Sequence, residues 1–413
     1  MDALSRKRVL FISYDGMSDP LGQSQVIPYL QGLVKAGYGI SLLSCEKPEA
    51  YQQKKTTIAA LLQQSNIQWY PIKYTKRPPV LSTVYDVFKL KRKARQIYKQ
   101  QPFAMVHTRV GIPSMVGLWL KKKYGVKFLN DIREFYADSR VDGGMWNRSS
   151  FVYNAIYNYF KKQEHQEFIN SDGLVCLTHA AQKIISTWPG YNAAIPLHVI
   201  PCSADLDLFN INSVVKSRRE QYAQQWEIAP GDMVISYLGS IGGWYLTKEM
   251  LECCRAISQK IPSAKFLFIS PHRHEQILEY AHQFGIPSQK IITVKADRKE
   301  VPLFLSLSKF SIFFIKPCYS KQSSSPTKHG EIMAMGIPVI TNSGVGDVAQ
   351  IVRSCDGGLV LNSFSQEAYD EVAASLETFP AKAQKIREAA QQIYSLDNAV
   401  QSYIALYKKI LGC

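Results

Sequence analysis

The sequence has no hydrophobic run long enough to cross a bilayer. Its longest apolar stretches, such as residues 115–120 and 311–315, are far shorter than the roughly 20 residues of a membrane-spanning helix. Its eight cysteines show no metal-binding or disulfide spacing, and the one close pair, Cys253 and Cys254, is adjacent in the chain. We therefore expect a protein of the reducing cytosol that has no disulfide bonds.

Two motifs of common nucleotide enzymes are either missing or out of context. No Gly-x-Gly-x-x-Gly sequence follows the first predicted strand, residues 8–13, which argues against a Rossmann dehydrogenase. One Asp-x-Asp triplet occurs, at residues 205–207, but it lies in a predicted connection between domains, and no nucleotide-binding pattern surrounds it.

The sequence has fewer acidic than basic residues. The 413 residues include 49 Lys or Arg and 33 Asp or Glu, which gives a formal net charge of +16. Between Lys73 and Gln101, nine basic side chains accompany one acid, Asp86. No nucleic-acid recognition motif or aromatic stacking array accompanies this charge, so we do not expect a nucleic-acid partner.

The centre of this basic segment has the pattern of one amphipathic helix. Its apolar positions recur at helical spacing and are Val87, Leu90, Ala94 and Ile97. The other faces carry Lys89, Lys91, Arg92, Lys93 and Arg95. Two interpretations fit: residues 73–101 dock on an anionic membrane surface, or the helix has a solvated basic face.

The length and the order of elements predict two α/β domains. A chain of this size exceeds one hydrophobic core. Its first half alternates strands with helices, which favours a doubly wound parallel sheet. The predicted strands are residues 8–13, 40–44, 104–107, 126–130 and 173–177, and the predicted helices are 25–36, 113–124 and 151–168. In the last helix, Val152, Ile156, Tyr159 and Phe160 form an apolar stripe that we expect to pack in the core.

The alternation stops at residues 199–209 and then restarts. The second set of strands is 233–238, 265–270, 291–294 and 310–316, with helices at 248–260, 274–284 and 397–411. We therefore expect two facing Rossmann-like domains, 1–205 and 206–395, with a deep cleft between them.

Residues 322–347 combine the parts of a nucleotide-diphosphate pocket. Pro326 favours a helix start, and Ser323, Ser324 and Ser325 precede it as caps. The free N–H groups of a helix start suit a phosphate, and Lys328 adds a positive charge there. Glu331, about one turn on, can accept from ribose hydroxyls. We expect Lys328 and Glu331 to be exposed at this helix start.

A glycine-rich turn supplies a second phosphate-binding element. It follows the predicted strand 233–238 and contains Gly239, Ser240 and Gly242. Glycines let a backbone approach phosphate closely, although a plain tight turn has the same composition.

These segments resemble GT-B glycosyltransferases, in particular glycosyltransferase family 4. Residues 324–340 are similar to the family variant "SSPTKxGExLAxGxPVI", and residues 199–209 to the interdomain segment "VIPNGVDxxxF". The resemblance implies that Gly239, Ser240, Gly242, Ser325, Thr327, Lys328 and Glu331 bind a nucleotide-sugar donor. Two family charges are replaced, a glutamate by Ser323 and an arginine by Ser240, which leaves Lys316 or Lys321 as helpers of Lys328.

The resemblance extends to the first half of the chain. Residues 14–30 are similar to "YDGxxDPLGQSQxxPYL", a loop that would place Gly22 beside the sugar, and residues 131–144 to "DxRxFWADxxVDGG". A histidine near the anomeric carbon is common in the family, and its position falls on Asp131. We expect Asp131 and Arg133 to be catalytic. A buried ion pair between them is the alternative.

The resemblance implies a retaining enzyme that uses a nucleotide-diphosphate sugar. The acceptor is expected to be a glycan or a lipid-linked molecule of surface-polysaccharide assembly, at the inner face of the cytoplasmic membrane. No cofactor or essential metal is expected, because basic groups and a helix end neutralise the leaving diphosphate. Residues 396–413 are expected to pack on the N-terminal domain. The alternative hypothesis is a GT-B scaffold protein without activity, because Ser240 and Ser323 lack the family's charges.

Overall fold

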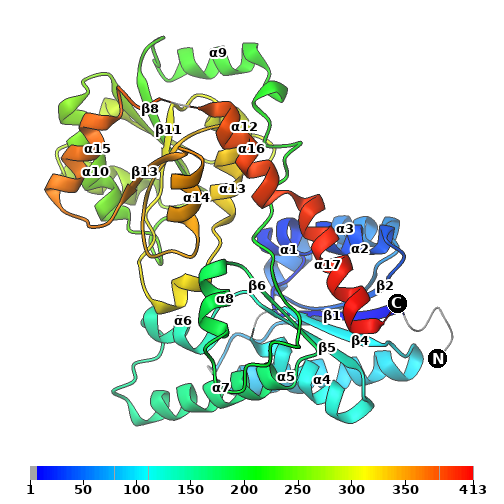
Figure 1. Cartoon of the computed structure of the whole chain (residues 1–413). Helices are drawn as coiled ribbons and strands as arrows, with labels where there is room; N and C mark the ends of the chain where they lie inside the picture. Colours follow the sequence, from blue (N-terminus) through cyan, green and yellow to red (C-terminus); the bar gives the residue numbers. More distant parts are fainter. Residues whose placement is uncertain (1–6, 79, 110, 381, 413) are drawn as a thin grey trace. The chain divides into compact units, whose positions relative to one another are not determined.

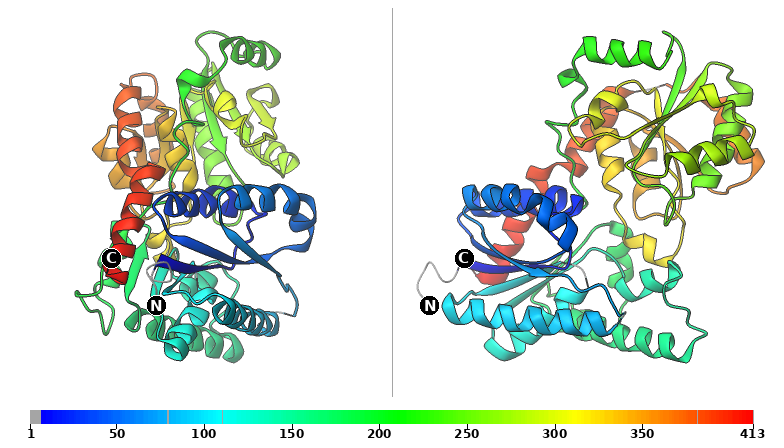
Figure 2. Two further views of the ribbon diagram at one scale, coloured as in Figure 1. Left: turned by 90° about the vertical axis from the view of Figure 1, so that its right-hand side faces the viewer. Right: turned by 180° about the vertical axis from the view of Figure 1, so that it is seen from behind.

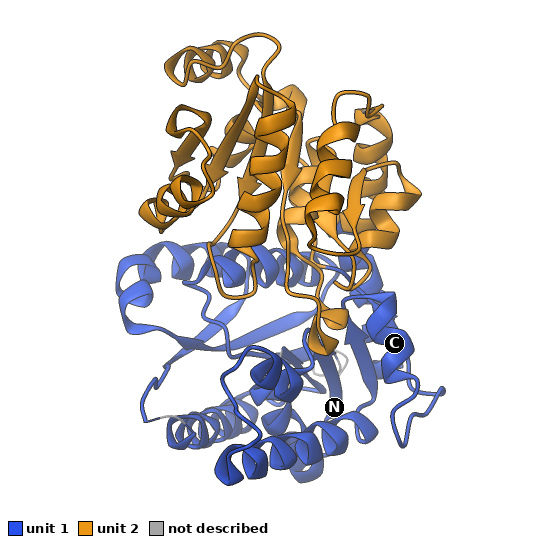
Figure 3. Ribbon diagram, turned by 90° about the vertical axis from the view of Figure 1, so that its left-hand side faces the viewer, with its two compact units in different colours: residues 1–201, 396–413 blue, residues 202–395 orange. Residues whose placement is uncertain are grey.

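The chain forms two compact units, coloured separately in Figure 3. The computed structural model describes residues 7–78, 80–109, 111–380 and 382–412. Unit 1 consists of residues 1–201 and 396–413, and unit 2 consists of residues 202–395. The last helix, α17 (Leu396–Leu411), belongs to unit 1 and packs on α2 (Ile27–Lys35). None of the helices in the described ranges is long and apolar enough to cross a membrane.

Unit 1 is built on a seven-stranded parallel sheet with the order β3-β2-β1-β4-β5-β6-β7 (Figure 1). The sequence predicted five of these strands and missed the two edge strands. The strands are β1 Arg8–Ser13, β2 Gly39–Glu46, β3 Gln68–Lys73, β4 Met105–Arg109, β5 Lys127–Ile132, β6 Gly173–Cys176 and β7 Leu197–Val199.

Helices cover both faces of this sheet. Val9 and Phe11 of β1 pack with α2 and α17, whereas Leu10 and Ile12 pack with α4 and α5, as alternate side chains of a strand must. Figure 2 shows these layers, with α17 in red. The other helices of unit 1 are α1 Pro20–Gln25, α3 Pro48–Gln64, α4 Leu81–Gln100, α5 Ile112–Tyr124, α6 Tyr136–Asp142, α7 Phe151–Ile169 and α8 His179–Ile185.

One helix prediction for unit 1 is confirmed with shorter bounds, and one packing prediction was wrong. The helix predicted at residues 25–36 is α2, which begins only at Ile27 because the chain breaks at Val26 between α1 and α2, each of which has a proline in its first turn. The apolar stripe of α7 is not in the core, since Val152 is 62% and Tyr159 50% exposed. Helix α7 packs on α5 and α6 and buries only its last turn, at Glu167 and Phe168.

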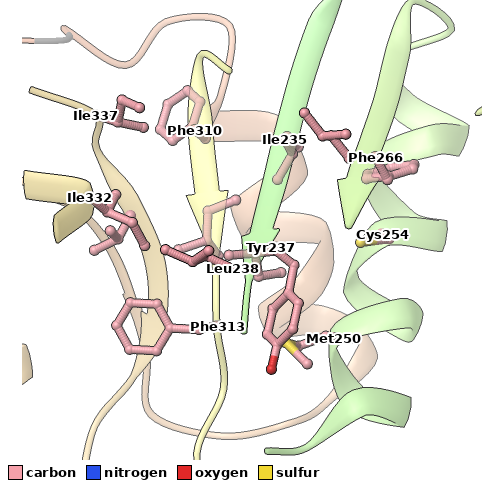
Figure 4. Close-up of a cluster of buried hydrophobic side chains, with 14 of the residues drawn as sticks. Ile235, Tyr237, Leu238, Met250, Cys254, Phe266, Phe310, Phe313, Ile332 and Ile337 are labelled. Atoms are coloured by element: carbon pink, nitrogen blue, oxygen red, sulfur yellow. The ribbon is translucent and has the colours of Figure 1, made fainter. Parts of the chain in front are cut away.

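Unit 2 is built on a six-stranded parallel sheet with the order β10-β9-β8-β11-β12-β13. Figure 4 shows its core, where Ile235 and Leu238 of β8 lie among side chains of neighbouring strands and helices. The strands are β8 Met233–Leu238, β9 Ala264–Ile269, β10 Ile291–Val294, β11 Phe310–Ile312, β12 Val339–Asn342 and β13 Gly358–Leu361. The α-helices are α9 Lys216–Gln225, α10 Thr247–Lys260, α11 His274–Gln283, α12 Val301–Leu305, α13 Thr327–Ala334, α14 Val348–Ser354, α15 Gln366–Ser375 and α16 Ala383–Tyr394.

Both sheets reverse their strand order at one point. Strand β1 lies between β2 and β4, and β8 lies between β9 and β11. In open α/β sheets, ligands bind outside the carboxyl ends of the strands at such a point. The loops after β1 and β4 in unit 1, and after β8 and β11 in unit 2, are therefore the places to look for a site.

Candidate donor site and a buried polar network

The turn after β8 needs its glycines. Gly239, Gly242 and Gly243 have φ angles of +121°, +76° and +64°, a region that other residues rarely adopt. A Cβ atom on Gly239 would also lie 2.8 Å from the Nζ atom of Lys328. The turn therefore brings bare backbone directly against a buried lysine.

Lys328 is the centre of this site. Its side chain comes from the first turn of α13, and its Nζ atom lies 3.3 Å from the hydroxyl of Tyr237. The ammonium also lies 3.7 Å from the ring centroid of Tyr245 and 4.4 Å from that of Tyr237. Burial lowers the pKa of Lys328 to about 7, and the nearby Glu331 opposes this shift only in part.

The prediction that Lys328 and Glu331 are exposed was wrong. Their exposed fractions are 7% and 6%, because α13 is buried within unit 2 and packs on α16. Glu331 accepts a hydrogen bond of 2.7 Å from Arg298, which lies in the loop after β10. Burial raises the pKa of Glu331, and the Arg298 charge partly offsets this effect.

The serines before α13 do not cap it. The cap residue is Pro326, and no side chain makes a capping hydrogen bond. Ser325 instead accepts a 3.2 Å bond from the backbone N–H of Cys202, and Ser323 donates a 2.7 Å bond to the carbonyl of Ser320. The first N–H groups of the helix are thus not bonded to these hydroxyls. Gly336, with φ +73°, follows the end of the helix.

Two basic side chains flank the glycine-rich turn, where Ser240 carries no charge. Arg273 donates a 3.2 Å bond to the carbonyl of Ile241, and a Cβ atom on Gly242 would lie 2.8 Å from its Nη1 atom. The ammonium of Lys321 lies 3.7 Å from the ring centroid of Trp244. The sequence did not single out Arg273, because it comes from the loop after β9.

Asp131 and Arg133 lie in a buried polar network of unit 1. Asp131, within β5, is 1% exposed. Its carboxylate accepts a 2.8 Å hydrogen bond from Tyr403 of α17 and lies 3.5 Å from His107 Nε2 and 3.7 Å from Arg133 Nη1. Burial alone would raise the pKa of Asp131, but the charge of Arg133 and the close His107 outweigh it and hold the pKa at about 2.

This geometry favours the ion-pair interpretation of Asp131 and Arg133. Arg133 also donates a 3.1 Å hydrogen bond to the backbone carbonyl of Ile200, so it joins two segments of unit 1. Burial lowers the pKa of His107, whose Nδ1 atom lies 2.8 Å from the Tyr407 hydroxyl. The partners from α17 were missed, because no local pattern links residues some 270 positions apart.

Gly22 has a packing role that the sequence did not show. It lies in α1, and a Cβ atom there would come within 2.2 Å of the carbonyl oxygen of Gly16. Only glycine allows this approach of helix and loop. The same loop donates hydrogen bonds of 2.8 and 3.1 Å from the N–H groups of Met17 and Ser18 to Glu46.

Most of unit 2 matches a known family model. Residues 218–393 match the family model described as "Glycosyl transferases group 1". This range contains the glycine-rich turn and the whole of α13. Unit 2 is a group 1 glycosyltransferase domain. This domain supports a glycosyltransferase and argues against the dehydrogenase hypothesis.

Solved structures show the same fold over nearly the whole chain. A glycosyltransferase from Rickettsia africae ESF-5 is 14% identical, with a TM-score of 0.73 and coverage of 98% of both chains. Anabaena Alr3699/HepE in complex with UDP and glucose is 12% identical, with a TM-score of 0.68 and coverage of 96% of this chain and 98% of that one. WaaG, a glycosyltransferase involved in lipopolysaccharide biosynthesis, is 15% identical, with a TM-score of 0.68 and coverage of 96% and 99%. No curated protein matches the sequence. The fold is GT-B.

Proposed function

We propose that this protein is a glycosyltransferase that takes its sugar from a nucleotide-diphosphate sugar and transfers it with retention to a glycan or lipid-linked acceptor. The observation that carries the proposal is Lys328, a buried lysine held between two tyrosine rings beside a glycine-rich turn. Within the described part of the chain, Lys328 forms no ion pair with an acidic side chain. A buried ammonium in this situation is costly unless an anion joins it. The acceptor process proposed is surface-polysaccharide assembly.

The donor diphosphate is proposed to lie against Lys328 and the turn after β8. The backbone N–H of Ser240, with Ser325 and Thr327 at the start of α13, completes its hydrogen bonds. The N–H groups of Gly239 and Gly242 already donate to the carbonyl of Ile269 and the hydroxyl of Thr247, so these glycines serve the site through their backbone conformation. Glu331 accepts from the ribose hydroxyls through the carboxylate oxygen that Arg298 leaves open. The solved complex of HepE with UDP and glucose, which has the same fold, supports a donor of this kind.

The chemical role of these groups is to stabilise the leaving nucleoside diphosphate. Negative charge grows on its outer phosphate as the bond to the sugar breaks, and preformed positive groups lower the energy of that transition state. The negative charge of the bound phosphate raises the pKa of Lys328, so the lysine holds its proton more tightly. In this proposal neither a metal ion nor another cofactor is essential.

The donor proposal is tested by thermal stability. Nucleotide sugars carrying UDP, GDP, ADP or dTDP are added in turn, and a bound ligand raises the melting temperature. We expect one nucleotide to raise the Tm of the parent protein, and Glu331→Ala to reduce this rise. NMR of the product then gives the anomeric configuration. No shift with any nucleotide sugar would contradict the donor site, and an inverted anomer would contradict retention.

We also propose that residues 73–101 bring the enzyme to an anionic membrane surface. In α4, Arg92 and Arg95 are exposed, and the ammonium groups of Lys91 and Lys93 lie 5.8 Å and 5.1 Å from the ring centroids of Trp119 and Tyr70. Each basic residue near such a surface contributes about 1 kcal/mol. Replacing these four residues with glutamine should abolish co-sedimentation with anionic vesicles, as should high salt. Equal sedimentation of variant and parent at low salt would favour a solvated face.

A further inference from the structure

Unit 1 contains a cavity of about 770 Å³ that the donor site does not use. It is formed by the loop after β2, the loop after β3 and the first half of α4. Its size is in the range of sites that bind small molecules. It opens at the carboxyl ends of β2 and β3, at the edge of the sheet and apart from the point where the strand order reverses.

Lysines dominate the wall of this cavity. Lys47, Lys73, Lys76 and Lys89 line it, against one acid, Glu49. Lys47 pairs with Asp19 at 2.9 Å, and Lys89 pairs with the buried Asp86 at 2.7 Å.

The other two lysines have no such partner. Lys73 and Lys76 are exposed, and among the described residues neither forms an ion pair with an acidic side chain. Lys89 is held in place by bonds to the carbonyl of Lys73 and, at 2.9 Å, to the hydroxyl of Thr75. The cavity therefore has a fixed frame and two free positive charges, which suit an anion such as a phosphate.

An exposed apolar stripe begins at the mouth of the cavity. Leu81, Val84, Tyr85 and Phe88 of α4 are 66%, 62%, 55% and 60% exposed and follow helical spacing on one side of the helix. Tyr85 belongs to both features, because it also lines the cavity. The opposite side of α4 is buried in the core of unit 1 through Val87 and Leu90. This stripe was not predicted from the sequence, because the run of basic residues that begins at Lys89 dominates the segment.

A basic cavity joined to an apolar stripe matches a molecule with a phosphate head and a hydrocarbon tail. We propose that the acceptor is lipid-linked through phosphate, with the phosphate in the lysine cavity and the hydrocarbon chain along the stripe. This inference rests on the proposed glycosyl transfer and narrows its acceptor from a glycan or a lipid to a lipid phosphate. A free glycan would leave both the two lysines and the stripe without a partner.

The test measures binding of farnesyl diphosphate, a soluble prenyl diphosphate, by calorimetry without membranes. Inorganic pyrophosphate serves as the head alone and farnesol as the tail alone. We expect farnesyl diphosphate to bind at least tenfold more tightly than either. Lys73→Gln with Lys76→Gln should weaken both diphosphates at least tenfold, whereas Leu81→Ser with Phe88→Ser should weaken only farnesyl diphosphate.

Matched controls lie on exposed surfaces outside the cavity. Lys122→Gln with Lys162→Gln removes two exposed charges from α5 and α7, and Val152→Ser removes an exposed apolar group from α7. Both controls should bind farnesyl diphosphate like the parent. An equal loss in the Lys122 and Lys162 control would overturn the cavity, because it would show that only the total charge of the protein matters. If pyrophosphate bound as tightly as farnesyl diphosphate, the stripe would have no role in binding, and this part of the proposal would be overturned. The nucleotide-sugar thermal shift is measured on every variant, so failure of the donor proposal is seen separately.

Discussion

Both units bury a charged side chain near the parallel sheet, but the surroundings of the two charges differ. In unit 1, Asp131 has a tyrosine, a histidine and an arginine around it, and its pKa is held at about 2. In unit 2, Lys328 faces two aromatic rings and a tyrosine hydroxyl, and burial lowers its pKa to about 7. A charge with its partners inside the protein supports the fold, whereas a charge that burial destabilises is prepared for an external partner.

The strongest test of this contrast is Asp131→Ala. It leaves Arg133 buried without its carboxylate, and breaking a buried pair in this way costs about 3–5 kcal/mol. We expect chemical denaturation to show a loss of this size. Donor binding, which we propose for unit 2, should persist at temperatures where the variant is folded. Full stability combined with a large loss of kcat would instead make Asp131 a catalytic group.

The pH dependence of unit 1 follows from the same carboxylate. Because the pKa of Asp131 in the folded protein is about 2 and its ordinary value is 3.8, the unfolded chain takes up its proton first as the pH falls. Its stabilising contribution is present above about pH 4 and is lost towards pH 2. In Asp131→Ala this part of the acid sensitivity should be missing.

Lys328→Met should behave in the opposite way. Methionine has a similar length and removes the desolvation cost of the ammonium, so the Tm of the free protein should be equal to or higher than that of the parent. Nucleotide-sugar affinity should fall at least tenfold, because a charge-assisted hydrogen bond worth about 1.5–3 kcal/mol is lost. A lower Tm with unchanged affinity would make Lys328 a structural residue like Asp131.

The smallest expected effect is that of Arg273→Gln. This side chain is exposed at the glycine-rich turn, and exposed ion pairs contribute about 0.2–1 kcal/mol. Donor affinity should fall roughly two- to fivefold by calorimetry, and stability should not change. The matched control is Lys248→Gln. It removes another positive charge from unit 2, from a side chain whose ammonium lies over the ring of Tyr280. An equal loss in both variants would mean that Arg273 has no specific role at the turn.

The fold was largely predictable because its strands are apolar runs bounded by turns. Strands β1, β8 and β10 have the predicted bounds. Strand β3 was missed because it contains Pro71 and is only partly buried, as edge strands often are. Strand β7, with three residues, is too short to show a pattern.

The helix start of the candidate site was visible in the sequence, but its surroundings were not. A helix start with Pro326 and Lys328 is a local pattern that the sequence shows directly. The burial of Lys328 depends on Tyr237 and Tyr245, and the partner of Glu331 is Arg298, from another loop. Such contacts are made by the sheet, which brings the carboxyl ends of distant strands to one edge.

Proton uptake on donor binding tests the role of Lys328 most directly. With a pKa of about 7 in the free protein, Lys328 is mostly neutral at pH 8, and a bound diphosphate restores its charge. Calorimetry of the nucleotide sugar at pH 8, in buffers of different ionisation enthalpy, should show uptake of about 0.9 proton per ligand, and far less at pH 6. In Lys328→Arg the uptake should vanish. Binding without proton uptake at pH 8 in the parent protein would contradict the assignment of Lys328 to the donor diphosphate.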